Sequence, residues 1–280
     1  MIHYNPKDWF GLIFHFHKSD TFRTLFWVIV SVALYSTLVV YLEREVFETT
    51  FSTSVMHSLL GFVISLLLVF RTNTAYERWW EGRKQWGALV NVARNYSFKI
   101  RNFVNDEEAQ ERMIRLNALY PYALKEHLRI ADYALLPPGI QAEITEIAGA
   151  KQHVPNAIAL KMQSELHACE VSFAQELAMI EDIERFTNIC GACERIKKTP
   201  IPYNYNIFIK KFIFAYILTM PIGFGASFGY WTVLASSFTF YTLASLELIA
   251  ESIEDPFGLD TDDLPTDELA ETIDNNLKEV

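Results

Sequence analysis

The sequence predicts an all-helical membrane protein with four transmembrane helices and a soluble helical layer. Three uncharged stretches carry this prediction, namely residues 24–42, 49–70 and 212–246. A helix rises about 1.5 Å per residue, so each of the first two stretches matches one bilayer core of about 30 Å. The third would reach about 52 Å as one helix, and its Pro221 and Gly229 favour a hairpin of two spans instead.

The composition fits a chain that is partly embedded in a membrane and partly soluble. Hydrophobic residues make up 51% of the 280 residues, charged residues make up 21%, and the mean hydropathy is +0.11. The formal net charge of −10 argues against a nucleic-acid partner, which usually needs a basic face. Much of the acid lies in residues 251–280, which we interpret as an acidic cytosolic tail. Its first part, residues 253–265, is expected to be either an ordered loop or disordered.

The first membrane segments predict how the chain is oriented. Residues 1–20 mix aromatic and basic side chains without a cleavage pattern, which favours an interfacial helix over a buried soluble helix. Residues 24–72 hold the first two spans, joined by a Glu-rich link. Basic residues gather after Phe70, so the positive-inside rule places that end and both termini in the cytosol. The hairpin of the third and fourth spans is expected over residues 208–250.

The second membrane helix is expected to continue into polar sequence without a break. No Pro falls between Ser54 and Tyr120, which predicts one long helix that leaves the membrane and runs to about residue 103. We interpret this helix as the wall of a pore that continues from the membrane into the cytosol.

Residues 104–198 predict a cytosolic helical region. One helix is expected to stop at Pro137-Pro138-Gly139, and another to run from Pro155 through Cys190. Cys190 and Cys193 have the spacing of a metal or redox pair. A second pair is missing and His167 lies far upstream, so we interpret them as free thiols.

One stripe on the second span suggests a functional site. Phe62, Leu66 and Phe70 recur every four residues and stay within roughly 80° of arc on a helix. They either pack against a neighbouring helix or, with several copies around an axis, form apolar rings that gate ions by dewetting. Spacing alone favours packing.

Three motifs favour the apolar rings over packing on a neighbouring helix. They are RTNTAYERWWEGRKQWGALVNVARN (71–95), TPIPYNYNIFIKKFIF (199–214) and IEDPFGLDTDDLP (253–265). The whole chain resembles the bestrophin family, specifically its bacterial branch. The resemblance implies a homopentameric ion channel in the bacterial inner membrane, with four membrane helices per subunit, lipid around them and a cytosolic vestibule on the central axis. Its hydrophobic neck would fall on Phe62, Leu66 and Phe70, and its cytosolic aperture on Ile180.

The resemblance extends to the acidic segment, with a departure. Eukaryotic bestrophins hold Ca²⁺ after the Pro-Phe-Gly element, and Asp260 and Asp263 match carboxylate positions there. Leu259 stands where the family has a Glu, and the loss of a carboxylate weakens a site that needs six to eight oxygens. We therefore interpret this segment as a structural acidic belt and expect no cofactor.

The sign of the permeant monovalent ion is predicted from the outer link. Glu43, Glu45 and Glu48 against Arg44 give about −2 per subunit, or roughly −10 in a pentamer, which attracts cations. Bacterial members of the family favour monovalent cations (Na⁺ or K⁺), whereas animal members pass chloride. We expect cation selectivity, with an anion channel of the same architecture as the alternative.

Two other classes compete with a channel. A membrane enzyme would need convergent catalytic groups, yet no H-E-x-x-H, G-x-S-x-G or P-loop pattern occurs in the sequence. A secondary transporter usually shows inverted repeats, and no repeat is detectable here. The sequence therefore predicts a channel and no enzyme.

Overall fold

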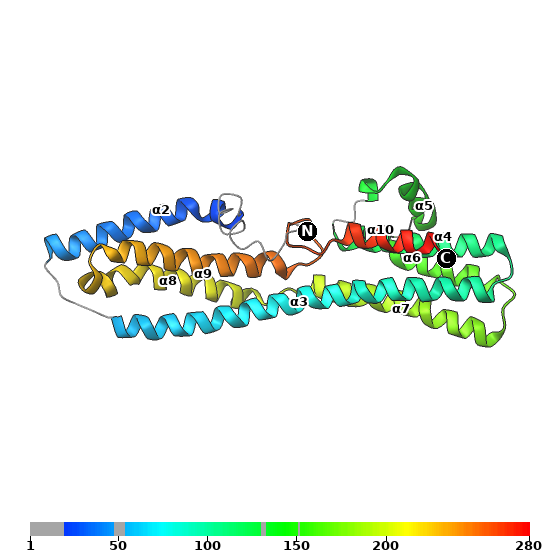
Figure 1. Ribbon diagram of the computed structural model, residues 1–280, viewed down its shortest axis with the longest axis horizontal. Helices are drawn as coiled ribbons and strands as arrows, with labels where there is room; N and C mark the ends of the chain where they lie inside the picture. Colours follow the sequence, from blue (N-terminus) through cyan, green and yellow to red (C-terminus); the bar gives the residue numbers. More distant parts are fainter. Residues whose placement is uncertain (1–19, 48–53, 130–132, 151) are drawn as a thin grey trace. The chain divides into compact units, whose positions relative to one another are not determined.

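Helices form nearly all of the structure, a computed structural model that describes residues 20–47, 54–129, 133–150 and 152–280 (Figure 1). The first helices are α2 (Asp20–Tyr41), the π-helical turn η2 (Leu42–Val46), α3 (Ser54–Phe103) and α4 (Glu107–Leu128). They are followed by the 3₁₀ turn η3 (Tyr133–Leu135), α5 (Pro138–Ala148), α6 (Val154–His167) and α7 (Phe173–Lys198). The last three are α8 (Tyr203–Phe228), α9 (Trp231–Glu254) and α10 (Thr266–Lys278). The interfacial helix expected before Asp20 lies outside the described residues.

The chain divides into two compact units. The spanning unit comprises Ile2–Glu77 and Ile201–Glu254, and its described part begins at Asp20. The polar unit comprises Arg78–Pro200 and Asp255–Val280. Within the described residues, four helices are long and apolar enough to cross a membrane, in the segments Thr21–Val46, Ser54–Phe103, Tyr203–Phe228 and Trp231–Glu254. The predicted all-helical membrane fold with four spans is confirmed.

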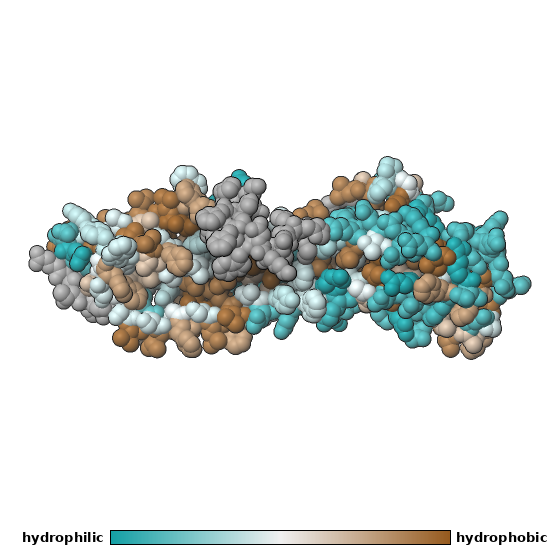
Figure 2. All heavy atoms as spheres, in the orientation of Figure 1, coloured by the Kyte–Doolittle hydropathy of each residue, from teal (hydrophilic) through white to brown (hydrophobic). Residues whose placement is uncertain are grey.

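The spanning unit is held together by apolar packing and by a few buried hydroxyl groups. Ile64 and Leu68 of α3 are each 1% exposed and belong to one core with Ile213 and Ile217 of α8. Helix α2 packs along α9, where the buried hydroxyl groups of Ser36 and Ser236 are hydrogen-bonded at 2.8 Å. Figure 2 shows hydrophobic side chains gathered on the outer surface of this unit, as expected for a surface in contact with lipid.

The turn between the third and fourth spans lies at Gly229. This residue has φ 55°, a backbone conformation that glycine adopts readily. It caps α8, whose last residue is Phe228. Pro221 lies inside α8 and does not end it, because neighbouring helices can satisfy the backbone groups that a proline frees in a membrane helix. The hairpin expected from residues 208–250 is therefore α8 and α9.

The polar unit surrounds a second core. Helix α4 packs against α6 and α10, and α6 packs against α7. The core contains Trp86 and Tyr96 of α3 with Tyr120 of α4 and Phe186 of α7, all at 0% exposure. The Tyr120 hydroxyl donates to the Phe186 carbonyl at 3.0 Å, so this buried phenol is satisfied. Hydrophilic side chains cover most of the face of this unit seen in Figure 2.

Two expectations for this region were wrong. Pro137-Pro138 does not stop a helix, because α4 ends at Leu128 and Pro138 is the first residue of α5, where a missing N–H costs nothing. The helix expected from Pro155 through Cys190 is two helices, since Ser172 and Gln175 form a capping box that begins α7. Residues 255–265 form an ordered loop, one of the two expected alternatives, and α10 (Thr266–Lys278) follows it.

Candidate functional site

Helix α3 has two different faces within the spanning unit. Ile64, Leu68 and Arg71 are each 1% exposed and point into the unit. Phe62, Leu66 and Phe70, the predicted neck residues, are 70%, 47% and 55% exposed. The three side chains therefore lie on the outer face of α3, where the described helices of the same chain leave about half or more of each side chain uncovered. Large apolar groups in such a stripe contact lipid, contact another copy of the chain, or line a narrow pore.

The predicted aperture residue Ile180 lies in α7. Its side chain is half-buried and packs against the core of the polar unit. It stands in the second turn of α7 rather than in the middle of a longer helix, because α7 begins only at Phe173. The side chain thus keeps part of its surface free for a neighbour or for water.

The three acids of the outer link do not share one environment. Glu43 is 8% exposed and lies against α8, where a Cβ on Gly225 would overlap its carboxylate. Glycine at position 225 is therefore what lets this side chain fit. Glu45 is exposed, and Glu48 lies outside the described residues. An exposed negative ring at this end thus depends on Glu45 and Glu48, because the charge of Glu43 is turned inward.

The acidic segment before α10 is an ordered turn anchored to α3. Phe257 and Leu264 are 0% and 2% exposed, and the Trp79 indole of α3 donates to the Asp262 carbonyl at 3.0 Å. Trp79 therefore positions this segment, a role that the sequence analysis did not assign. Beside it, the guanidinium of Arg78 donates to the carbonyls of Ile196 and Thr199.

The candidate calcium residues do not form the site that the resemblance implies. Asp263 is 3% exposed, and its Oδ2 accepts the Asp260 N–H at 2.7 Å. The Asp260 side chain is exposed, and Leu259 is 69% exposed and offers no oxygen. Ca²⁺ takes six to eight oxygen ligands, and this donor set is far smaller.

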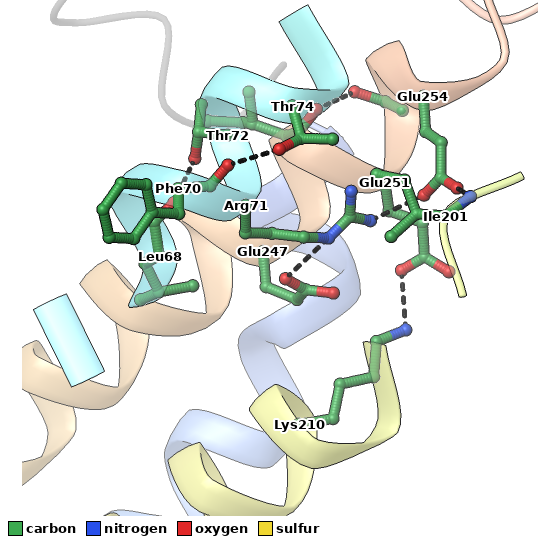
Figure 3. A network of polar contacts seen from close by, with 12 residues as sticks. Leu68, Phe70, Arg71, Thr72, Thr74, Ile201, Lys210, Glu247, Glu251 and Glu254 are labelled. Atoms are coloured by element: carbon green, nitrogen blue, oxygen red, sulfur yellow. Dashed lines mark hydrogen bonds and ion pairs between the residues drawn. The ribbon is translucent and has the colours of Figure 1, made fainter. Parts of the chain in front are cut away.

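A buried ion cluster at the end of the spanning unit was not predicted. The Arg71 guanidinium lies 3.5 Å from Glu247 and 2.8 Å from Glu254, and the second oxygen of Glu254 accepts the Ile201 N–H at 2.8 Å (Figure 3). An exposed pair, Lys210 with Glu251, lies beside it at 2.9 Å. A basic residue at the end of a membrane helix commonly reaches toward water. Arg71 instead joins α3 to α9 and to the segment that precedes α8.

Comparison with known proteins identifies the family. A family model described as "Bacterial/Fungal Bestrophin protein" matches residues 1–279, which is almost the entire chain. This chain belongs to the bestrophin family.

The curated relatives of this bestrophin carry the name of a channel. A voltage-dependent anion channel-forming protein from Synechocystis sp. is 34% identical over 241 residues, covering 82% of this chain and 78% of the relative. One from Nostoc sp. is 30% identical over 292 residues, covering 98% of this chain and 92% of the relative. One from Escherichia coli K12 is 28% identical and covers 79% of this chain and 74% of the relative.

Solved structures show the same fold. A bacterial bestrophin homologue from Klebsiella pneumoniae matches with a TM-score of 0.80 and 28% identity, covering 91% of this chain and 97% of that chain. A single-substitution variant of that homologue matches with a TM-score of 0.81. The family and the four apolar helices together identify this bestrophin as a membrane ion channel and not an enzyme.

Asp263 gives this bestrophin a testable pH dependence. Burial raises the pKa of its carboxyl group to about 6, partly offset by the Asp260 N–H that stabilises the charged form. The native state therefore holds a proton between about pH 4 and 6 that the unfolded chain has lost, so stability falls as the pH rises through about 6. Asp263→Asn mimics the protonated acid, whose stability does not depend on this titration. We therefore expect the melting temperature of the variant minus that of the original chain to be larger at pH 7 than at pH 5. The gain should be about 1 kcal/mol. An equal difference at both pH values would contradict this prediction.

Proposed function

We propose that five copies of this chain surround one axis and form a channel that conducts monovalent ions passively. Phe62, Leu66 and Phe70 of each copy would form an apolar neck in the membrane, and Ile180 a second constriction in the cytosol. The observation that carries the proposal is the exposed apolar stripe of α3, opposite a face that is packed inside the spanning unit. In a bestrophin, five such stripes around an axis give stacked rings that lose water when narrow and so block ions.

The proposed setting is the bacterial inner membrane, with lipid around the spanning unit and both termini in the cytosol. This orientation is supported by the basic residues that follow Phe70, among them Arg78, Lys84 and Arg94. Basic residues stay on the cytosolic side of a membrane far more often than acidic ones do.

Two candidates for the sign of the ion each have a specific observation in their favour. Conduction of anions fits the names of the relatives from Synechocystis and Nostoc, which are called anion channel-forming proteins. Conduction of cations was predicted from the outer acids, and it now depends on Glu45 and Glu48 because Glu43 is buried. An apolar neck has no charge with which to choose between them, so selectivity would reside at the entrances.

The acidic segment is proposed to act without bound calcium. Its turn is already closed by the Asp263 carboxylate on the Asp260 N–H and by Trp79 on the Asp262 carbonyl. Hydrogen bonds of this kind hold the backbone of the turn in place, as a bound ion would otherwise do.

The test uses the full-length chain in detergent and in planar bilayers. We expect a protein mass of about 160 kDa, five times the 32.3 kDa of one chain, and unitary current steps after reconstitution. The reversal potential under a salt gradient then gives the sign of the ion directly. If cations permeate, Glu45→Gln should move the reversal potential toward zero. A monomeric mass, or purified pentamers without current steps, would refute the proposal.

A further inference from the structure

Four side chains with the chemistry of metal ligands meet in the polar unit. They are His127 from the last turn of α4, His153 at the residue that caps the start of α6, and Cys190 and Glu194 from α7. One donor atom from each lies within 4.8 Å of the donor atoms of the other three. None of the four belongs to the proposed neck, aperture or acidic segment.

The two imidazoles share one carboxylate oxygen. Glu194 Oε1 lies 2.5 Å from Nε2 of His127 and 3.1 Å from Nε2 of His153, and the two rings are 4.4 Å apart between centroids. In this arrangement two Nε2 atoms converge on a point beside the carboxylate. Simple helix capping or surface pairing brings one His to one acid, and it does not require a second imidazole close to the first.

The thiol lies on the same face of α7 as the carboxylate. Cys190 and Glu194 are four residues apart, so their side chains are neighbours on the helix. Cys190 is 2% exposed, whereas the side chains of His127, His153 and Glu194 are 17%, 35% and 20% exposed. The cluster is thus closed on the thiol side and open on the His153 side, which leaves a path for an ion to enter.

The distances suit a tetrahedral ion after small side-chain movements. Zinc binds nitrogen and oxygen at about 2.0–2.2 Å and sulfur at about 2.3 Å, so ligand atoms around it lie about 3.3–3.8 Å apart. The observed separations run from 2.5 Å to at most 4.8 Å and so bracket these values. A thiolate and a carboxylate together neutralise a divalent ion, while the two imidazoles add no charge.

We propose that His127, His153, Cys190 and Glu194 bind a transition-metal ion of the Zn²⁺ class, which ties the end of α4 and the start of α6 to α7. Two nitrogens, one sulfur and one oxygen suit zinc, whereas Ca²⁺ and Mg²⁺ prefer oxygen ligands alone. This inference does not depend on the chain conducting ions.

Binding requires three proton movements. Nε2 of His127 now donates to the Glu194 carboxylate, so its proton must move to Nδ1 before Nε2 can bind the ion. Burial raises the pKa of the Cys190 thiol to about 12, so the ion must displace that proton, which leaves to solvent. His153 now accepts the Asn156 N–H on Nδ1 at 3.3 Å, and ligation through Nε2 moves its proton to Nδ1 and ends that long hydrogen bond. The cost of losing one helix cap is about 1 kcal/mol, which is small beside the free energy of binding zinc.

Cobalt and zinc provide the test on the full-length protein in detergent. Dialysis against Zn²⁺ should leave about one ion per chain, and Co²⁺ should give a thiolate-to-metal charge-transfer band in the near ultraviolet. Cys190→Ser should abolish that band, and Glu194→Gln, which keeps the side-chain shape, should weaken Zn²⁺ binding at least about tenfold. Zn²⁺ should also raise the melting temperature of the original chain but not that of the variants.

Two variants serve as matched controls. His167→Ala removes an imidazole that meets one carboxylate, that of Glu176 at 3.2 Å, and Cys169→Ser removes a thiol outside the cluster. Both should bind Zn²⁺ and Co²⁺ as the original chain does. The proposal is overturned if Zn²⁺ is not retained, if the Co²⁺ band survives Cys190→Ser, or if Cys169→Ser removes it. Each outcome is read without measuring current, so it is independent of the proposed channel.

Discussion

Arg71→Leu is expected to lower the free energy of unfolding by about 3–5 kcal/mol. The substitution leaves Glu247, whose side chain is 5% exposed, buried without its cation and also removes the 2.8 Å contact to Glu254. An unpaired buried charge is costly because the carboxylate has lost its water and gains nothing in return. Denaturant or thermal unfolding of the detergent-solubilised protein measures the loss.

A control and a compensating variant separate charge from packing. Lys210→Met removes the neighbouring pair with Glu251, in which both side chains are about half exposed, and should cost less than about 1 kcal/mol. Replacing Arg71 by Leu together with Glu247 by Leu and Glu254 by Gln should recover most of the stability, because no charge is then left buried alone. If Arg71→Leu proves as mild as Lys210→Met, the cluster does not hold the spanning unit together.

Replacing Phe62, Leu66 and Phe70 together by Ala should raise the fraction of time that the channel is open several-fold. Smaller side chains widen the proposed neck, so water and ions can remain in it. Stability should change little, because all three side chains are at least 47% exposed in the single chain and leave no cavity in its core. Single-channel recording in bilayers gives the open fraction, and detergent melting gives the stability.

The matched control removes exposed apolar groups from other spans. Leu34 and Leu38 of α2 and Leu234 of α9 are 68%, 56% and 63% exposed. Replacing these three by Ala deletes a similar amount of apolar surface but leaves the α3 stripe intact, so gating should be unaltered. Equal open fractions in both triple variants would show that the stripe of α3 is not the gate.

The spans could be predicted from the sequence because a long apolar stretch without charged residues can be recognised without knowing what it packs against. Residues 24–42 and 49–70 are long enough for lipid whatever surrounds them. The break before α7 also has a local signal, the capping box of Ser172 and Gln175. Ala168–Val171 contains no Pro or Gly, so the sequence before the capping box does not indicate that a helix ends there. Helix α10 had a readable signal too, since Ala270, Ile273 and Leu277 recur at helical spacing after Pro265.

The polar partners could not be predicted because they are distant in sequence. Arg71 meets Glu254 across 183 positions, and nothing near Arg71 tells a buried ion pair from a charge that reaches toward water. His127 and His153 join Cys190 only after α4, α6 and α7 have packed together, so their distance from Cys190 along the chain does not reveal the cluster. Glu43 likewise was predicted to add charge to the outer entrance, but its carboxylate is buried against Gly225, which is 182 positions away in sequence.

The hydroxyl contact between Ser36 and Ser236 has a consequence for how the protein is made. Residue 36 enters the membrane early in synthesis, while its partner is still two hundred positions from being translated. Until α9 arrives, α2 lacks its main neighbour, and the Ser36 hydroxyl can donate only within its own helix, as those of Ser31 and Thr37 do. A ribosome stalled before residue 231 would therefore hold a chain whose first span still lacks the helix it packs along.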